Sequence, residues 1–183
     1  MDSKRSGEFR NGKAVRIMVS GLMVAVVAMA VTAIASAQED TNLKFRGAIG
    51  VIPVTGVAAA NGAVNLNVVR GVNPAGPWRI ADLNANVNSE GRIRVKGRGL
   101  LLAAGNGIGT NAGASVFATL FCGPAATATA HSSDRVALDA DGDFAIDDLL
   151  SPMPPASCGT PVLLIRNGGG SGVWFAAGIP EVK

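Results

Sequence analysis

The stretch that decides the fold is GRIRVKGRG, residues 91–99, where a basic side chain stands at every second position. Side chains in an extended strand point alternately to opposite faces, so these basic residues are predicted to share one face. Ile93 and Val95 then point the other way, toward a core. The predicted outward row consists of Arg92, Arg94, Lys96 and Arg98.

The same alternation begins before this stretch and predicts a β-hairpin over residues 78–102. Leu83, Ala85 and Val87 alternate with polar residues, and the NSEG sequence that follows them supplies a turn. The basic row is therefore expected to form one arm of an antiparallel hairpin.

Further short segments have the composition of strands. A second hairpin is predicted over residues 136–146, with its turn at 139–143, and a third closes the chain, where PVLLIR and VWFAAGI flank NGGGSG. Residues 47–54, 63–69 and 115–122 bring the expected total to about nine strands.

No long segment after residue 37 keeps the 3.6-residue apolar period of a helix. Short strands joined by turns predict an all-β fold, an antiparallel β-sandwich of the immunoglobulin-like type, with a small barrel as the alternative. A membrane barrel is not favoured, because such barrels need girdles of aromatic residues and this sequence has no Tyr and two Trp.

The first 37 residues have the three parts of a secretory signal helix: a basic stretch, an apolar run over residues 17–35, and the small-residue triplet ASA at 35–37. Cleavage after Ala37 is predicted, and an uncleaved anchor is the alternative. The remainder divides into a flexible segment at 38–45 and a single β-sandwich domain at 46–183. A secreted or periplasmic protein is expected.

The positive charge of the chain lies in this leader. The whole sequence carries 16 Lys and Arg against 13 Asp and Glu, and residues 1–37 hold five of the basic and two of the acidic groups. The rest therefore has 11 of each, which argues against a nucleic-acid partner, and no membrane partner is expected after cleavage.

Two cysteines, Cys122 and Cys158, remain in a chain that is expected to mature in an oxidising compartment. An even count there predicts one disulfide, and the spacing fits no zinc motif. Closing a loop of this length stabilises the fold by about 4 kcal/mol in the chain-entropy model.

The most suggestive metal site is the Asp-rich turn DADGD. Carboxylates at alternate positions of a turn can converge on calcium, so Asp139, Asp141 and Asp143 are candidate ligands. The places where an EF-hand needs Gly and Glu hold Phe144 and Leu150. The competing interpretation is a solvated turn, for which Asp and Gly are well suited. Calcium is the one cofactor considered, and otherwise none is expected.

Catalytic groupings are weak. The sequence HSSD at 131–134 contains the residue types of a triad, but neighbours in one loop generally cannot align as a relay, and an ordinary polar loop is expected. The glycine-rich GNGIGTNAG at 105–113 lacks the end of a phosphate-binding loop. A hydrolase would need dispersed groups to converge in one cleft; these groups are Asp82, His131, Asp139 and Asp147.

Two tryptophans supply the large aromatic surfaces. Trp174 lies in a strongly apolar run and is predicted to be part of the core, whereas Trp78 fits either a core position or an exposed sugar-stacking platform.

The order of these elements resembles exported bacterial β-sandwich proteins to which no activity is assigned. The shared features are a GVNPAGPW segment, an alternating hairpin and a closing PVLLIR to WFAAG hairpin over one disulfide. A fainter similarity to the CHRD type of immunoglobulin-like domain covers most of the mature chain in pattern. The His-x-His and terminal Gly-x-Ile-Arg-Gly features of that family are missing, so no site residue is transferred from it.

These observations favour a secreted, non-enzymatic β-sandwich with a structural, adhesive or binding role at the cell exterior and an extracellular glycan or protein as partner. A calcium-stabilised binding module and a hydrolase are the alternatives. The row Arg92 to Arg98 is expected mainly to pair across strands and to protect a sheet edge, with capture of an anionic glycan as its second use.

Overall fold

The computed structural model describes residues 42–52, 56–58, 63–65 and 67–181. The predicted signal peptide and the first residues of the segment 38–45 lie outside this range. All regular elements of the described residues are strands, and none of these residues belongs to a helix that could cross a membrane. The all-β prediction is confirmed.

Nine of the 13 strands form one antiparallel sheet in the order β10-β8-β12-β13-β1-β5-β6-β11, with β9 also paired to β8. These strands are β1 (Leu43–Gly50), β5 (Asp82–Val87), β6 (Arg92–Arg98), β8 (Ser115–Cys122), β9 (Thr129–Ser132), β10 (Val136–Ala137), β11 (Phe144–Leu149), β12 (Val162–Asn167) and β13 (Trp174–Pro180). The other four strands form two separate two-stranded sheets: β2 (Gly56–Ala58) pairs with β3 (Ala63–Asn65), and β4 (Trp78–Arg79) pairs with β7 (Leu101–Leu102).

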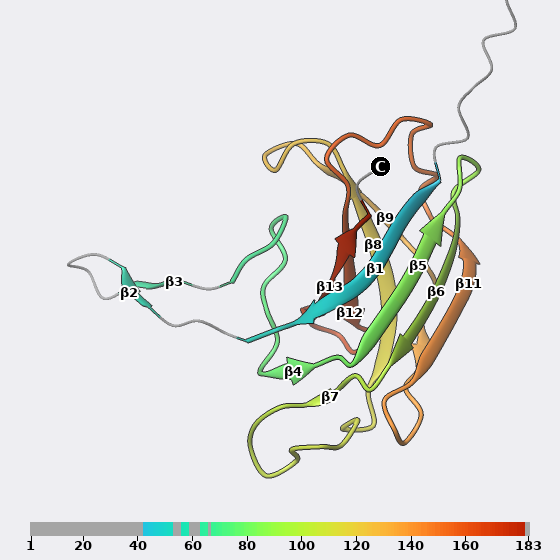
Figure 1. The fold of residues 1–183 in the computed structure, drawn as a ribbon. Helices are drawn as coiled ribbons and strands as arrows, with labels where there is room; N and C mark the ends of the chain where they lie inside the picture. Colours follow the sequence, from blue (N-terminus) through green and yellow to red (C-terminus); the bar gives the residue numbers. More distant parts are fainter. Residues whose placement is uncertain (1–41, 53–55, 59–62, 66, 182–183) are drawn as a thin grey trace, which may run out of the picture. The chain divides into compact units, whose positions relative to one another are not determined.

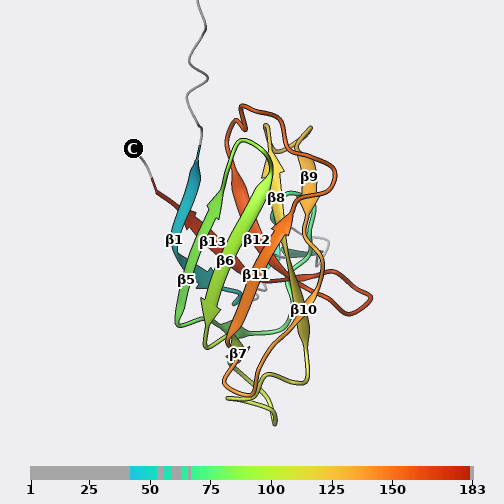
Figure 2. The same ribbon diagram turned by 90° about the vertical axis from the view of Figure 1, so that its right-hand side faces the viewer.

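The main sheet curls so that β1, β5, β6 and β11 face β8, β12 and β13 across one core (Figures 1 and 2). Its two ends meet where Ser132, the last residue of β9, pairs with Ser151 just after β11. Each serine donates its backbone N–H to the carbonyl of the other, at 2.9 and 2.8 Å. The predicted two-layered arrangement therefore comes from one sheet folded onto itself.

The ends of the sheet are also joined by a side chain. Asp148 of β11 accepts a hydrogen bond from the backbone N–H of Asp134 at 2.7 Å through Oδ2, and one from the N–H of Leu149 at 2.7 Å through Oδ1. The Asp148 carboxylate thus accepts backbone hydrogen bonds that a strand carbonyl would accept if β11 were paired with the segment between β9 and β10.

Alternation builds the core as the sequence predicts. In β6 the inward side chains of Ile93 and Val95 are buried while their neighbours are more exposed, and β5 buries Leu83, Ala85 and Val87 in the same way. Both tryptophans are buried, so Trp174 is a core residue as predicted. Trp78 is not an exposed platform, because the residue is 5% exposed and its ring stacks on Phe175.

One predicted boundary and one predicted strand pairing are wrong. β1 begins at Leu43 and Phe45 is fully buried, so the domain starts before residue 46. The predicted hairpin over residues 136–146 has its turn but not its pairing, because β10 pairs with β8 and β11 pairs with β6. The two arms leave the turn toward opposite ends of the curled sheet.

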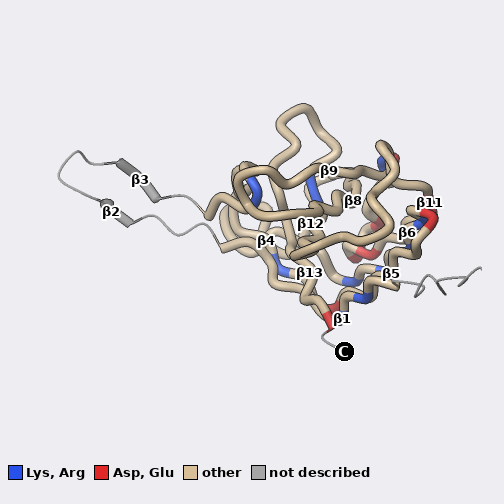
Figure 3. The backbone as a smooth tube through the Cα atoms, turned by 90° about the horizontal axis from the view of Figure 1, so that it is seen from above, with Lys and Arg blue, Asp and Glu red and all other residues tan. Residues whose placement is uncertain are grey.

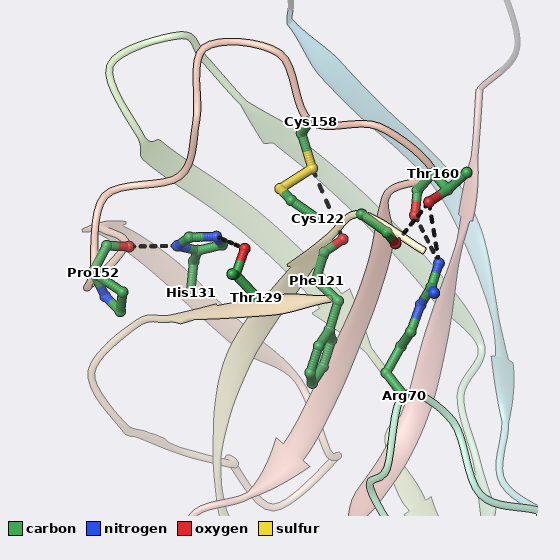
Figure 4. The surroundings of a disulfide bond; sticks show 9 residues. Arg70, Phe121, Cys122, Thr129, His131, Pro152, Cys158 and Thr160 are labelled. Carbon is green, nitrogen blue, oxygen red and sulfur yellow. Dashed lines mark hydrogen bonds between the residues drawn. A yellow bond between two sulfur atoms is a disulfide. The ribbon is translucent and has the colours of Figure 1, made fainter. Parts of the chain in front are cut away.

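The predicted disulfide between Cys122 and Cys158 is present, with a Cα–Cα distance of 4.8 Å (Figure 4). Cys122 ends β8, and Cys158 lies in the segment that leads into β12, the strand next to β8. Nearby, the N–H of Gly123 donates to the carbonyl of Gly159 at 2.7 Å. The disulfide therefore fastens a loop to the end of its own sheet and does not cross between layers.

Candidate anion-binding face

The predicted basic row of β6 lies on the outer surface of the sheet. Arg94, Lys96 and Arg98 are exposed and Arg92 is half-buried, whereas Ile93, between them, is fully buried. The orientation predicted from the alternation is confirmed.

Neighbouring strands extend this row into a surface. The register places Lys44 of β1 opposite Asn86 of β5, and Asn86 opposite Arg94 of β6. On the next rung Arg46 faces Asn84, and Asn84 faces Lys96. We call the outward residues of β1, β5, β6 and β11, together with Glu181, which follows β13 and lies 3.9 Å from Arg46, the basic face. Its charged positions are among those coloured in Figure 3.

Acidic residues neutralise part of this face. Asp147 of β11 lies between two guanidinium groups, with its Oδ1 2.8 Å from Arg92 Nη2 and its Oδ2 3.4 Å from Arg94 Nε. Asp82 pairs with Arg98 at 3.1 Å. All these side chains are substantially exposed, so each pair stabilises the fold by at most about 1 kcal/mol. The predicted cross-strand pairing of the row is present at these positions.

Two lysines of the basic face have no such partner. Among the described residues no carboxylate lies within 4.0 Å of the ammonium group of Lys44 or Lys96. In the register, Lys96 has Asn84 on one side and Ala145 on the other. A strand position without an acidic neighbour leaves its charge available to a ligand.

Basic and acidic side chains are unevenly distributed between the basic face and the rest of the described residues. The basic face carries six basic side chains and three acidic ones, while the other described residues carry four basic and six acidic side chains. The basic side chains of the face are Lys44, Arg46, Arg92, Arg94, Lys96 and Arg98, and the acidic ones are Asp82, Asp147 and Glu181. A neutral domain thus presents one positive sheet surface.

The face ends at an open hollow of about 370 Å³. Lys96 and Arg98 line one part of it, and Asp139 and Asp143 line another. A dense polyanion would meet these carboxylates here, so the more favourable contact area lies toward β1.

The candidate calcium ligands serve the backbone of their own turn. Asp139 Oδ1 accepts the N–H groups of Asp141 and Asp143 at 3.0 and 2.8 Å, and Asp143 Oδ1 accepts the N–H of Gly99 at 2.9 Å. Gly142 completes the turn with a φ of 78°. Among the described residues no group of three or more His, Cys, Asp and Glu side chains is arranged to hold a metal ion. The geometry supports the competing interpretation of a solvated turn, and it adds that two of the carboxylates accept backbone hydrogen bonds.

The candidate hydrolase groups have separate surroundings. His131 is 4% exposed and fills both ring nitrogens with neutral partners: Nδ1 lies 2.7 Å from the carbonyl of Pro152, and Nε2 lies 2.9 Å from Thr129 Oγ1 (Figure 4). Asp82 and Asp147 pair with arginines of the basic face instead. The described residues do not bring these groups into one cleft.

The glycine-rich segment 105–113 forms a surface loop held by its own backbone. The N–H of Leu102 donates to Thr110 and the N–H of Gly109 donates to Leu102, both at 2.9 Å. The loop ends beside an open hollow of about 470 Å³ that Ala112, Gly113 and Trp78 help to line. Among the described residues, no charged side chain lines this hollow.

Four residues of the basic face escaped the sequence analysis: Lys44, Arg46, Asn84 and Asn86. Each pair stands at alternate positions of its strand, which is the same signal that revealed the row on β6. Their union with that row depends on strand register, which no local pattern specifies.

No protein-family model matches the chain, and comparisons with curated proteins and with solved structures also give no match. The similarity to exported bacterial β-sandwiches and to CHRD-type domains stays a prediction from the sequence.

Proposed function

We propose that this protein is an exported, non-enzymatic binding protein that contacts an anionic polymer at the cell exterior through its basic face. The observation that carries the proposal is the segregation of charge: one sheet surface has six basic side chains against three acidic ones, whereas the other described residues have four basic against six acidic. A polymer is favoured over a small anion because the positive groups are spread over β1 and β6 and are exposed.

Export is supported by the leader-like sequence of residues 1–37 and by the disulfide, since such bonds persist in oxidising compartments. A binding role is favoured over hydrolysis because the described Asp and His side chains of the hydrolase hypothesis have separate partners. The calcium-stabilised module finds no comparable support, since Asp139 and Asp143 bind backbone N–H groups.

Binding of heparin to the mature chain, measured by isothermal titration, tests the proposal. Heparin serves as a general polyanion probe. Lys44→Ser and Lys96→Ser each remove one unpaired charge and are expected to weaken binding about threefold, and the double variant about tenfold. Binding should also weaken with added salt, because the contacts are exposed.

Arg135→Ser is the matched control, because Arg135 is an exposed basic residue of the segment between β9 and β10, outside the basic face. It is expected to leave heparin affinity unchanged. Absence of heparin binding by the wild-type chain, or equal losses in the control and in Lys96→Ser, contradicts the proposal. Unchanged thermal unfolding of the variants shows that the losses do not come from misfolding.

A further inference from the structure

The part of the basic face near β1 has a regular geometry. Lys44 and Arg46 stand on β1, and Arg94 and Lys96 stand two strands away on β6 in matching register. Adjacent strands are about 4.8 Å apart and alternate residues about 7 Å apart, so the four cationic positions mark a rectangle of about 10 by 7 Å. The middle strand, β5, places Asn84 and Asn86 between them in the same two rungs.

The two amides are available for hydrogen bonding. Asn84 Oδ1 accepts a hydrogen bond from Arg46 Nη1, which leaves the amide nitrogen of Asn84 unused among the described residues. The side chain of Asn86 makes no hydrogen bond within that part of the chain, so its oxygen and its nitrogen are both free. An amide both donates and accepts, which suits a hydroxyl group.

We infer that this rectangle recognises an acidic polysaccharide, with the cations Lys44, Arg46, Arg94 and Lys96 binding carboxylate or sulfate groups and Asn84 and Asn86 binding sugar hydroxyls. This inference rests on the proposed function and names its ligand class. The amides at the centre of the rectangle add little to the binding of an anion that has no hydroxyls. For a polysaccharide they matter, because sugar hydroxyls that are buried in the contact without a hydrogen-bond partner reduce the binding free energy.

The carboxylates of the basic face also favour a polysaccharide ligand. Asp147 lies beside the rectangle, one strand beyond Arg94, and Asp82 pairs with Arg98 further along β6. They repel a densely charged polymer without hydroxyls, such as polyphosphate, but they accept hydrogen bonds from sugar hydroxyls. A chain in which hydroxyl groups accompany the acidic groups fits this mixture of side chains best.

The test compares three probes at one ionic strength and equal charge concentration: hyaluronate, which carries carboxylates, chondroitin sulfate, which adds sulfate esters, and polyphosphate, which has no sugar hydroxyls. Titration calorimetry of the mature chain is expected to show at least one polysaccharide binding about tenfold more tightly than polyphosphate. Preference for hyaluronate identifies carboxylate, and preference for chondroitin sulfate identifies sulfate, as the favoured acidic group.

Asn84→Ala/Asn86→Ala is expected to reduce polysaccharide affinity about three- to tenfold and to leave polyphosphate affinity unchanged. Asn106→Ala, at an exposed asparagine of the loop 105–113, is the control and should change neither. Equal or tighter binding of polyphosphate by the wild type, or an amide variant that binds polysaccharide normally, overturns the inference. Either result leaves the proposed function intact if Lys44→Ser/Lys96→Ser still weakens heparin binding, whereas loss of all polyanion binding defeats both.

Discussion

The ring of Phe144 lies over the Cα of Gly97, its partner across the β6–β11 ladder, in the space where a side chain of residue 97 would stand. Gly97 is the third inward position of β6, after Ile93 and Val95. An aromatic ring on one strand that covers a glycine on the next is a known device of curved sheets. The glycine in GRIRVKGRG therefore serves packing, although the sequence shows it only as a gap in the apolar pattern.

Gly97→Ala is predicted to destabilise the fold by about 1–3 kcal/mol, because the added methyl group meets the ring of Phe144 and forces it to move. Chemical unfolding of the mature chain measures the loss. Gly170→Ala is the matched control, since a methyl group there meets no atom within 4 Å and φ is not positive. Equal stability of Gly97→Ala and the wild type contradicts the packing described above.

Asp148→Ala is predicted to lower stability by about 1–3 kcal/mol, because the backbone N–H groups of Asp134 and Leu149 lose their acceptor. The loss should be accompanied by faster amide exchange at residue 134, where the sheet ends meet. Asp141→Ala is the control, because this exposed carboxylate makes no hydrogen bond among the described residues. A neutral Asp148→Ala shows that the bridge does not contribute.

Two substitutions in the DADGD turn distinguish a hydrogen-bonded turn from a calcium site. If the turn is held by hydrogen bonds, Asp139→Ala lowers the melting temperature through the loss of two backbone contacts, worth about 1–2 kcal/mol, and Asp141→Ala does not. Differential scanning calorimetry with and without calcium is expected to give the same melting temperature. A calcium-dependent rise that Asp141→Ala abolishes restores the metal site.

Cys122→Ser/Cys158→Ser is predicted to destabilise the protein by about 2–4 kcal/mol, since the bond closes a long loop in the unfolded chain. Denaturant unfolding gives the magnitude. Because the bond fastens a loop beside β12, limited proteolysis should cut the variant first within residues 151–161. Cleavage that begins elsewhere, or unchanged stability, argues against this role.

The strands with clear alternation could be predicted because their information is local. In β5 and β6 the period of two in the sequence reproduces the pattern of buried and exposed side chains, and the outward direction of Arg94 and Lys96 follows from it. The disulfide was predictable for a different reason, since only two cysteines exist and one pairing is possible.

The failures concern pairing between distant segments. The turn at 139–143 forms, yet β10 and β11 part and join β8 and β6, since the sheet curls and each arm finds its partner at a different end. Residues 43–45 were predicted to be flexible, but β1 gains partners on both sides, β5 and β13, and Phe45 enters the core. Local composition does not contain these contacts.

The sequence by itself determined the all-β class, the outward face of β6 and the one disulfide, because periodicity and residue count are properties of the chain. Only the tertiary structure decided which strands lie beside that face. Register brings Lys44 and Arg46, nearly 50 residues from the row on β6, into line with Asn84, Asn86 and the basic side chains of β6. Local spacing shows only a row of basic side chains on one strand. This row becomes part of a wider basic surface because antiparallel pairing aligns residues of strands that are far apart in sequence.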